Sequence, residues 1–306
     1  MRIIALMQHL DRRYQFFEWF AGAWQKSGGM IKRDIYLPRK IRALFGRPLG
    51  VAVRKSDRPK LLVCGCHRIE SCAWPWNYQY EIVPVMWDLW PGFYEFFAQF
   101  IVRNDVHYVF CTASQSVRWL QERFPSVKCT WLPEAIDVKS FPAGPRLKDR
   151  RVDVCCYGRS APQVEPALKR LAALHGESSI VRRCGESIDE LSEMIRNSKI
   201  AICFPRCDTD VNAADKARGV ETLTQRYWEA MCSGTLPVGR APKELVDLCG
   251  YNPVIPFSVD DAGMMENLLK HIEDYQGLVD RNRTCAERIG DWSARMAIVR
   301  NAFRES

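Results

Sequence analysis

From residue 60 onward the sequence alternates between short apolar runs and stretches with helical periodicity. The runs are rich in β-branched and aromatic residues, as in "KLLVCGC" at 60–66 and "YEIVPVMW" at 80–87. Strand and helix in alternation predict parallel strands, because a parallel connection needs a crossover segment that covers the sheet. We therefore expect an α/β fold.

The segment 132–151, "LPEAIDVKSFPAGPRLKDRR", interrupts this alternation with prolines, a glycine and several charges. Such a composition is typical of a linker. We expect a linker at 134–151 between two Rossmann-like parallel-sheet domains at 60–133 and 152–290, with a last helix at 291–306 that packs back on the first domain. A chain of 306 residues suits two domains.

The first 59 residues are basic and differ in pattern from the rest. Residues 1–60 hold fourteen Lys or Arg against four Asp or Glu, while the whole chain carries a net charge of +8. Apolar residues recur in steps of four and three from Ile3 to Trp24, which favours an amphipathic helix, although "MRIIALM" could instead form a first strand. We expect an added basic helical segment at 1–59.

An uneven charge of this kind indicates an anionic partner. We expect an anionic membrane surface to bind residues 1–60, and no nucleic acid. A solvated basic face without a partner is the alternative, and the same helix could instead mediate dimerisation, so the oligomeric state stays open.

Cysteine usage and hydropathy indicate a cytoplasmic protein, peripheral at the inner face of a membrane. The thirteen cysteines show no regular spacing, which argues for a reducing compartment. No apolar run is long enough for a membrane-spanning helix, and the start lacks a signal-peptide pattern. The densest group, "CGCHRIESC" at 64–72, lacks the paired spacing of a zinc site, so we expect free thiols there.

Two glutamates, Glu221 and Glu229, stand eight positions apart in "GVETLTQRYWEAMCSGTLPVG". On a helix over 221–232 they would share one polar stripe, and Gly234 would end the helix. The first N–H groups of such a helix can bind a phosphate, and a carboxylate further along could accept hydrogen bonds from a ribose diol. The alternative is a solvated helix with Glu229 paired to Arg226.

This block resembles a known family. Glu-x7-Glu followed by "AMCSGTLPVG" is similar to the nucleotide-sugar half of group 1 (GT4-like) glycosyltransferases of the GT-B fold, and "QRYWEAMCSGTLPVG" is closest to the spore-maturation-type branch. Other segments resemble the family in the same order, namely "VPVMWDLWP", "FCTASQSVRWLQERFPSVKCTWLPEAIDVKSF", "VDVCCYGR" and "DWSARMAIVRNAF". The resemblance covers roughly residues 80–303. It implies two Rossmann-like domains facing a cleft.

The resemblance implies an enzyme that moves a sugar from a nucleotide-diphosphate donor to a glycan or lipid-linked acceptor in cell-envelope or polysaccharide biosynthesis. We expect retention of anomeric configuration, no cofactor and no metal. Two alternatives stay open: a nucleotide-sugar epimerase, and an inactive GT-B body that serves as a binding or scaffold protein.

The resemblance also assigns roles to residues. Asp88 would be the catalytic base and Glu221 would contact the donor sugar, while Glu229 would hold the ribose and Arg159 the diphosphate. The full set of donor-binding residues that we expect is Gly158, Arg159, Lys216, Arg218, Thr222, Leu223, Thr224, Arg226 and Glu229. The sequence departs from the family at Trp87, where a histidine is usual, and lacks a lysine soon after the Gly-Arg pair, so the phosphate charge would fall to the arginines and Lys216.

The motif "CDTD" at 207–210 offers a competing prediction. In GT-A glycosyltransferases an Asp-x-Asp pair holds a divalent metal on the donor diphosphate. Here the motif precedes the Glu-x7-Glu block, whereas the GT-A fold would place it in the first half of the domain, so we expect an acidic loop and no metal.

Overall fold

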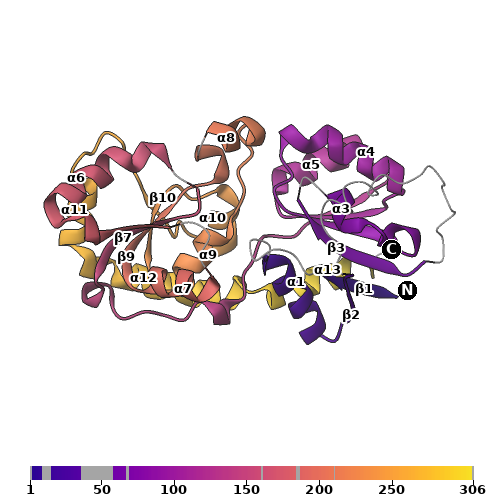
Figure 1. Cartoon of the computed structure of the whole chain (residues 1–306), viewed down its shortest axis with the longest axis horizontal. Coiled ribbons are helices and arrows are strands. Elements are labelled where there is room, and N and C mark those ends of the chain that lie inside the picture. The colour runs from indigo at the N-terminus through magenta and orange to yellow at the C-terminus, as the bar shows by residue number, and fades with distance from the viewer. Residues whose placement is uncertain are drawn as a thin grey trace. The chain divides into compact units, whose positions relative to one another are not determined.

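A computed structural model of the chain describes residues 2–8, 15–35, 58–66, 69–159, 161–183, 187–209 and 211–304. The chain divides into two compact units, each an α/β body (Figure 1). Unit 1 comprises Met1–Glu134, Lys216–Val220 and Trp292–Ser306, and unit 2 comprises Ala135–Asp215 and Glu221–Asp291.

Unit 1 contains, in its described part, a six-stranded parallel sheet in the order β2-β1-β3-β4-β5-β6. The strands are β1 (Ile3–Met7), β2 (Met30–Arg33), β3 (Lys60–Gly65), β4 (Glu81–Met86), β5 (Tyr108–Cys111) and β6 (Lys128–Trp131). The helices are α1 (Gln15–Lys26), α3 (Ile69–Ala73), α4 (Tyr94–Asn104), α5 (Ser114–Arg123) and α13 (Met296–Ala302). Strands β3 and β4 are buried along their whole length, as their continuous apolar runs require in a sheet covered on both faces.

The expectation of a helix over the first 25 residues is wrong for Ile3–Met7, which form strand β1. Only Gln15–Lys26 form the helix α1. The reason is that β1 lies between β2 and β3 in the sheet, and a strand buried on both faces carries an unbroken apolar run that periodicity alone cannot distinguish from a buried helix. The described part of the N-terminal segment is therefore the first β-α-β of unit 1, not an added helical segment. The cationic stretch at 36–57 lies outside the described residues.

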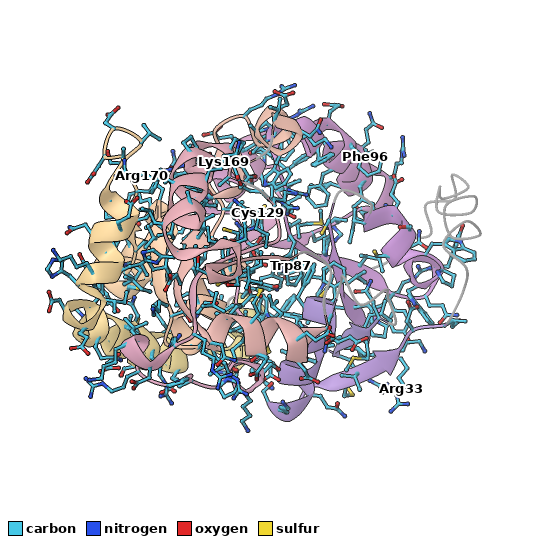
Figure 2. All side chains as sticks on the ribbon, turned by 60° about the vertical axis from the view of Figure 1, so that its left-hand side comes forward. Arg33, Trp87, Phe96, Cys129, Lys169 and Arg170 are labelled. Atoms are coloured by element: carbon cyan, nitrogen blue, oxygen red, sulfur yellow. The ribbon has the colours of Figure 1, made fainter. Side chains whose placement is uncertain are left out.

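An aromatic cluster fills the core of unit 1 beneath the end of β4. Trp87 is fully buried, with its ring centroid 5.0 Å from that of Phe17 and 5.4 Å from that of Trp292. Figure 2 shows Trp87 in the interior, while Phe96 on α4 projects from the surface. The C-terminal segment 292–303 thus completes a core that the N-terminal helix begins.

Unit 2 contains, in its described part, a five-stranded parallel sheet in the order β11-β10-β9-β7-β8. The strands are β7 (Val152–Tyr157), β8 (Ile180–Arg183), β9 (Ser198–Cys203), β10 (Leu236–Gly239) and β11 (Ile255–Pro256). The helices are α6 (Glu165–His175), α7 (Ile188–Arg196), α8 (Val211–Ala217), α9 (Gln225–Cys232), α10 (Lys243–Cys249), α11 (Met264–Lys270) and α12 (Gln276–Ile289). Helices α6 and α11 pack together over one apolar core of the sheet, and α9 packs against α7 and α12 (Figure 1). The two parallel sheets with flanking helices confirm the predicted fold class.

The segment predicted as a linker is tied to unit 2 by Arg150. This side chain is 5% exposed and donates hydrogen bonds to the carbonyl oxygens of Pro145 (2.9 Å), Ser198 (2.8 Å) and Ser233 (3.0 Å) and to the hydroxyl of Thr235 (2.7 Å). Burial lowers the pKa of Arg150 to about 10, so it stays charged at neutral pH. Among the described residues, no helix has both the length and the apolar character that a membrane crossing requires.

Candidate functional site

The chain of unit 2 reverses direction across its sheet between β7 and β9. From β7 it moves to β8 on one side, and then returns past β7 to build β9, β10 and β11 on the other. In open parallel sheets, ligands bind in the crevice outside the carboxyl ends of the strands at such a reversal. The residues that follow β7 and β9 are therefore the first place to look for a site.

A pocket of about 240 Å³ lies at this position. Its apolar wall consists of Cys156, Ala161, Val164 and Ile202, and its remaining lining residues are Tyr157, Gly158, Arg159, Glu165, Arg182 and Arg226. Burial raises the pKa of the Cys156 thiol to about 12, so this wall is uncharged. The lining carries three guanidinium groups against one carboxylate, that of Glu165, which accepts a 3.0 Å hydrogen bond from Arg182. Such a charge balance favours an anionic ligand.

Gly158 brings Arg226 into the pocket. Gly158 has a φ of +73°, and a Cβ built on it would lie 2.7 Å from Nη2 of Arg226. The absence of a side chain therefore lets the guanidinium lie against the backbone at the end of β7. The structure brings together three predicted donor-binding residues, Gly158, Arg159 and Arg226, from the end of β7 and the start of α9.

Helix α9 begins at Gln225, four residues later than the sequence pattern predicts. Thr224 precedes it with an extended backbone (φ −99°, ψ 158°), so Glu221 lies in the preceding loop and does not share a helical stripe with Glu229. Arg226 consequently lies in the first turn. Gly234 has a φ of +65° just after the helix, as predicted. The prediction failed at the helix start because spacing by four residues is also compatible with a loop that leads into a short helix.

The start of α9 has polar groups without protein partners. The N-cap Thr224 makes no side-chain capping hydrogen bond. Within the described part of the chain, Oγ1 of Thr222, Oγ1 of Thr224 and Nε2 of Gln225 are buried and have no hydrogen-bond partner. A buried polar group without a partner destabilises the fold unless something satisfies it. Orphaned groups at an uncapped helix start are a suitable setting for a polar ligand.

Glu229 is buried inside α9, with only 6% of its surface exposed. Of the described residues, none forms a hydrogen bond or ion pair with its carboxylate, so the predicted alternative pairing with Arg226 is absent. Burial raises the pKa of the Glu229 carboxyl to about 7, and the charge of Arg226 lowers it by a smaller amount. Glu229 is not one of the residues that line the pocket, but it influences the pKa of Tyr157, which does.

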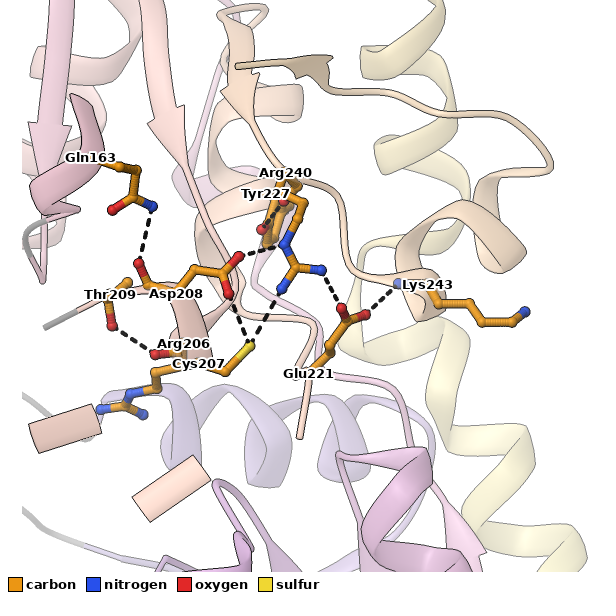
Figure 3. Close-up of polar contacts among 9 residues, drawn as sticks. All are labelled: Gln163, Arg206, Cys207, Asp208, Thr209, Glu221, Tyr227, Arg240 and Lys243. Atoms are coloured by element: carbon orange, nitrogen blue, oxygen red, sulfur yellow. Dashed lines mark hydrogen bonds and ion pairs between the residues drawn. The ribbon is translucent and has the colours of Figure 1, made fainter. Parts of the chain in front are cut away.

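Glu221 is held in place by a network that the sequence did not predict (Figure 3). One carboxylate oxygen pairs with Nη1 of Arg240, and the other accepts a 3.2 Å hydrogen bond from the backbone N–H of Lys243. Arg240 also pairs with Asp208 through Nε. Asp208 belongs to the "CDTD" motif, whose second aspartate, Asp210, lies outside the described residues.

A second unpredicted carboxylate, Glu244, lies in the first turn of α10. It is 5% exposed and accepts a 3.3 Å hydrogen bond from the backbone N–H of Leu223. The predicted site residue Leu223 is itself fully buried. The sequence signal for Arg240 and Glu244 was their position directly after a predicted strand, which is where side chains of parallel sheets gather at one edge.

The other predicted site residues lie in unit 1. Lys216 and Arg218 are exposed and group with unit 1, and Arg218 has a φ of +44°. Asp88 follows β4 and has a φ of +51°, a conformation that aspartate tolerates better than most residues. A side chain at the carboxyl end of a parallel strand is placed where ligands of such sheets bind.

The described residues contain no group of three His, Cys, Asp or Glu side chains that could bind a metal ion. Within "CGCHRIESC", His67 lies outside the described residues, and Cys64 is buried, which raises the pKa of its thiol. Cys64, Cys66 and Cys72 are free thiols.

No family model and no curated protein matches the sequence. Solved structures do match over essentially the whole chain. Sucrose-phosphate synthase from Thermosynechococcus elongatus is 12% identical with a TM-score of 0.63, and the match covers 100% of this chain and 99% of that one. HepE from Anabaena in complex with UDP is 10% identical with a TM-score of 0.55, covering 100% of both chains.

A glycosyltransferase from Rickettsia africae is 10% identical with a TM-score of 0.53, covering 98% of this chain and 96% of the other. The chain has the GT-B fold. At these identities the likeness establishes the fold alone, so the GT-B fold expected from the sequence is confirmed, and the spore-maturation branch stays a prediction.

Proposed function

We propose that the chain is a glycosyltransferase that moves a sugar from a nucleoside-diphosphate donor to a glycan or lipid-linked acceptor. The observation that carries this proposal is the arginine-lined pocket at the reversal point of the unit 2 sheet, beside an uncapped helix start. A diphosphate needs cationic groups and N–H donors, and this pocket offers both. The GT-B fold and the UDP bound to the similar HepE agree with it.

The donor's parts match separate features of unit 2. Arg159 and Arg226 would neutralise the diphosphate, and the backbone at Gly158 would let it approach closely. The Glu229 carboxylate, buried and without a partner among the described residues, would accept hydrogen bonds from the ribose hydroxyls. A ribose diol would thereby satisfy a carboxylate that the fold itself leaves without a partner. Thr222 and Thr224 would supply further polar contacts to the donor.

The reaction that we propose breaks the bond between the anomeric carbon and the diphosphate oxygen and forms a bond from that carbon to an acceptor hydroxyl. The diphosphate leaves with the bonding electron pair, and the guanidinium groups stabilise its charge. The acceptor proton passes to Asp88 of unit 1, which we propose as the base. This chemistry needs no cofactor, and we expect it to be independent of metal and to retain the anomeric configuration. Lys216 and Arg218 are the remaining candidates for contact with the donor phosphates.

Isothermal titration with UDP, GDP and their sugars tests the proposal, followed by transfer assays with and without EDTA. We expect micromolar binding of one diphosphate and its sugar. Arg226→Gln should weaken this binding by about tenfold or more, since a hydrogen bond between charged groups is lost. The matched control is Arg170→Gln, which removes an exposed ion pair with Glu266 on the surface of α6. Absence of any nucleotide binding would favour a scaffold, and conversion of the sugar without an acceptor would favour an epimerase.

A further inference from the structure

Arg240 joins three loops at the carboxyl edge of the unit 2 sheet. It follows β10 directly, and it pairs with Asp208 from the loop after β9 and with Glu221 from the loop before α9. Nη2 of Arg240 also donates to the sulfur of Cys207 at 3.4 Å. In Figure 3 the guanidinium lies between the two carboxylates, with each of its nitrogens directed at one partner.

The surrounding contacts hold this arginine rigidly. Its carbonyl oxygen accepts a 2.6 Å hydrogen bond from the phenol of Tyr227, and the carbonyl oxygen of Asp208 accepts a 3.0 Å bond from Nε2 of Gln163. Burial raises the pKa of the Cys207 thiol to about 11, so the sulfur adds no charge. The network therefore consists of one cation and two anions, with a net charge of −1.

Stability alone does not explain this arrangement. The side chains of Arg240, Asp208 and Glu221 are 40%, 29% and 25% exposed, and ion pairs this open to solvent contribute little to folding. What the network does is orient carboxylates: because Glu221 lies outside α9, no helix positions it, and Arg240 together with the N–H of Lys243 does so instead. Each carboxylate oxygen keeps a lone pair that can still accept a hydrogen bond.

We propose that Arg240 is a positioning residue that holds Glu221 and Asp208 as paired acceptors for hydroxyl groups of the donor's sugar ring, and that the site takes a neutral sugar in preference to a uronic acid. This inference rests on the proposed function. Two ionised acceptors recognise adjacent hydroxyls, whereas the net negative charge of the network repels a sugar that carries a carboxylate.

The test compares the affinity for the nucleotide sugar with the affinity for the diphosphate alone, by isothermal titration of the full chain. Wild type should bind the sugar form more tightly than the diphosphate. In Arg240→Gln we expect this gain to fall by roughly tenfold while diphosphate affinity stays within about twofold. Arg240→Lys should restore part of the gain, because a lysine can pair with one carboxylate but cannot form the fork. Asp208→Asn should lose part of it.

The matched control is Lys243→Ala. It removes the exposed side-chain pair with Asp247 but keeps the backbone N–H that binds Glu221, so it should behave as wild type. A second arm compares UDP-glucose with UDP-glucuronate, or GDP-mannose with GDP-mannuronate, and the uronate should bind about tenfold more weakly.

Several outcomes would overturn the proposal. Equal losses for diphosphate and sugar in Arg240→Gln would show a merely structural role, and an unchanged gain would show no role. Tighter binding of the uronate would mean that Arg240 exchanges its protein partners for the substrate. A wild-type protein that binds no diphosphate at all would remove the proposed function itself, which distinguishes that failure from a failure of the positioning role.

Discussion

The phenol of Tyr157, at the end of β7, donates a 3.0 Å hydrogen bond to the carbonyl oxygen of Arg226 in the first turn of α9. The Arg226 guanidinium in turn lies over the Tyr157 ring, 5.6 Å from its centroid. A strand end and a helix start that are far apart in sequence thus form one wall of the pocket. The wall is rigid, which favours a site that is formed before the ligand arrives.

The first prediction concerns Gly158. Gly158→Ala should weaken nucleotide binding by about tenfold or more, because the added methyl would displace the Arg226 guanidinium from the pocket. It should also lower the free energy of unfolding by about 1 kcal/mol, since alanine is strained at a φ of +73°. Titration calorimetry and urea unfolding measure the two effects separately.

Gly250→Ala is the control for this change. Gly250 has nearly the same φ, +74°, and nothing lies within 4 Å of its added Cβ. It should therefore show the loss of stability without the loss of binding. Equal binding losses in both variants would contradict the role that we assign to Gly158.

The second prediction concerns the stability conferred by position 229. The folded protein holds the pKa of Glu229 near 7, above the ordinary value of 4.5. Burying the ionised form therefore destabilises the fold fully above pH 7, and protonation relieves this as the pH falls towards 4.5. Glu229→Gln should be more stable than wild type at pH 8, by about 2 to 3 kcal/mol, with the difference vanishing near pH 5.

The same variant should bind the nucleotide at least tenfold more weakly at pH 8, because an amide is a poorer acceptor for two ribose hydroxyls than a carboxylate. Unfolding curves and calorimetry across pH 5 to 8 supply both readouts. A variant that is stabilised yet binds normally would separate Glu229 from the ribose.

The third prediction concerns the proposed base. Asp88→Asn keeps the size of the side chain and tolerates a φ of +51°, so the fold should be unaffected. Transfer should slow by about a hundredfold or more, as expected for the loss of a general base. Asp105→Asn is the matched control, because Asp105 also adopts a left-handed conformation (φ +49°) but caps the exposed end of α4. Similar activity in both variants would rule out Asp88.

The fourth prediction concerns the basic stretch near residue 40. Vesicles with anionic lipids should float with the protein at low salt and lose it as salt rises, because each basic residue near such a surface contributes about 1 kcal/mol. Replacing Arg39, Lys40 and Arg42 together by Glu should reduce vesicle binding at least a hundredfold. These three positions lie outside the described residues.

The control for vesicle binding reverses three cations of unit 2, Lys148, Lys169 and Arg170, which are all exposed. It changes the net charge by the same amount at a different place. If both triple variants lose binding equally, the attraction is non-specific, and binding that is absent in wild type at low salt would remove the membrane from the proposal.

Much of this architecture was predictable, because buried parallel strands carry unbroken apolar runs with turn residues at their ends. The runs at 60–66 and 80–87 became β3 and β4 on this ground. "MRIIALM" was ambiguous, since only its neighbours β2 and β3 decide that it is a strand. Local pattern thus identifies elements reliably where they are long, and fails where a short run depends on partners distant in sequence.

The site shows the same division. Gly158 and Arg226 were predicted from a turn glycine and a charged helix start, and the pocket brings them together. The contact of Arg240 with Asp208 and Glu221 could not be predicted, because it joins three loops whose proximity follows only from the order of β9 and β10 in the sheet. Spacing in sequence carries no information about such a junction.

Unit 1 is built from both ends of the sequence: Trp292 contacts Phe20 and Trp87, and the side chain of Arg295 donates a 3.0 Å hydrogen bond to the carbonyl oxygen of Pro133. During synthesis on the ribosome, its first 134 residues emerge long before the segment that seals their aromatic core. The intervening unit can acquire its own structure while the earlier one still waits with apolar rings uncovered. A nascent chain stalled before residue 292 should accordingly recruit chaperones and resist proteolysis only in its central part.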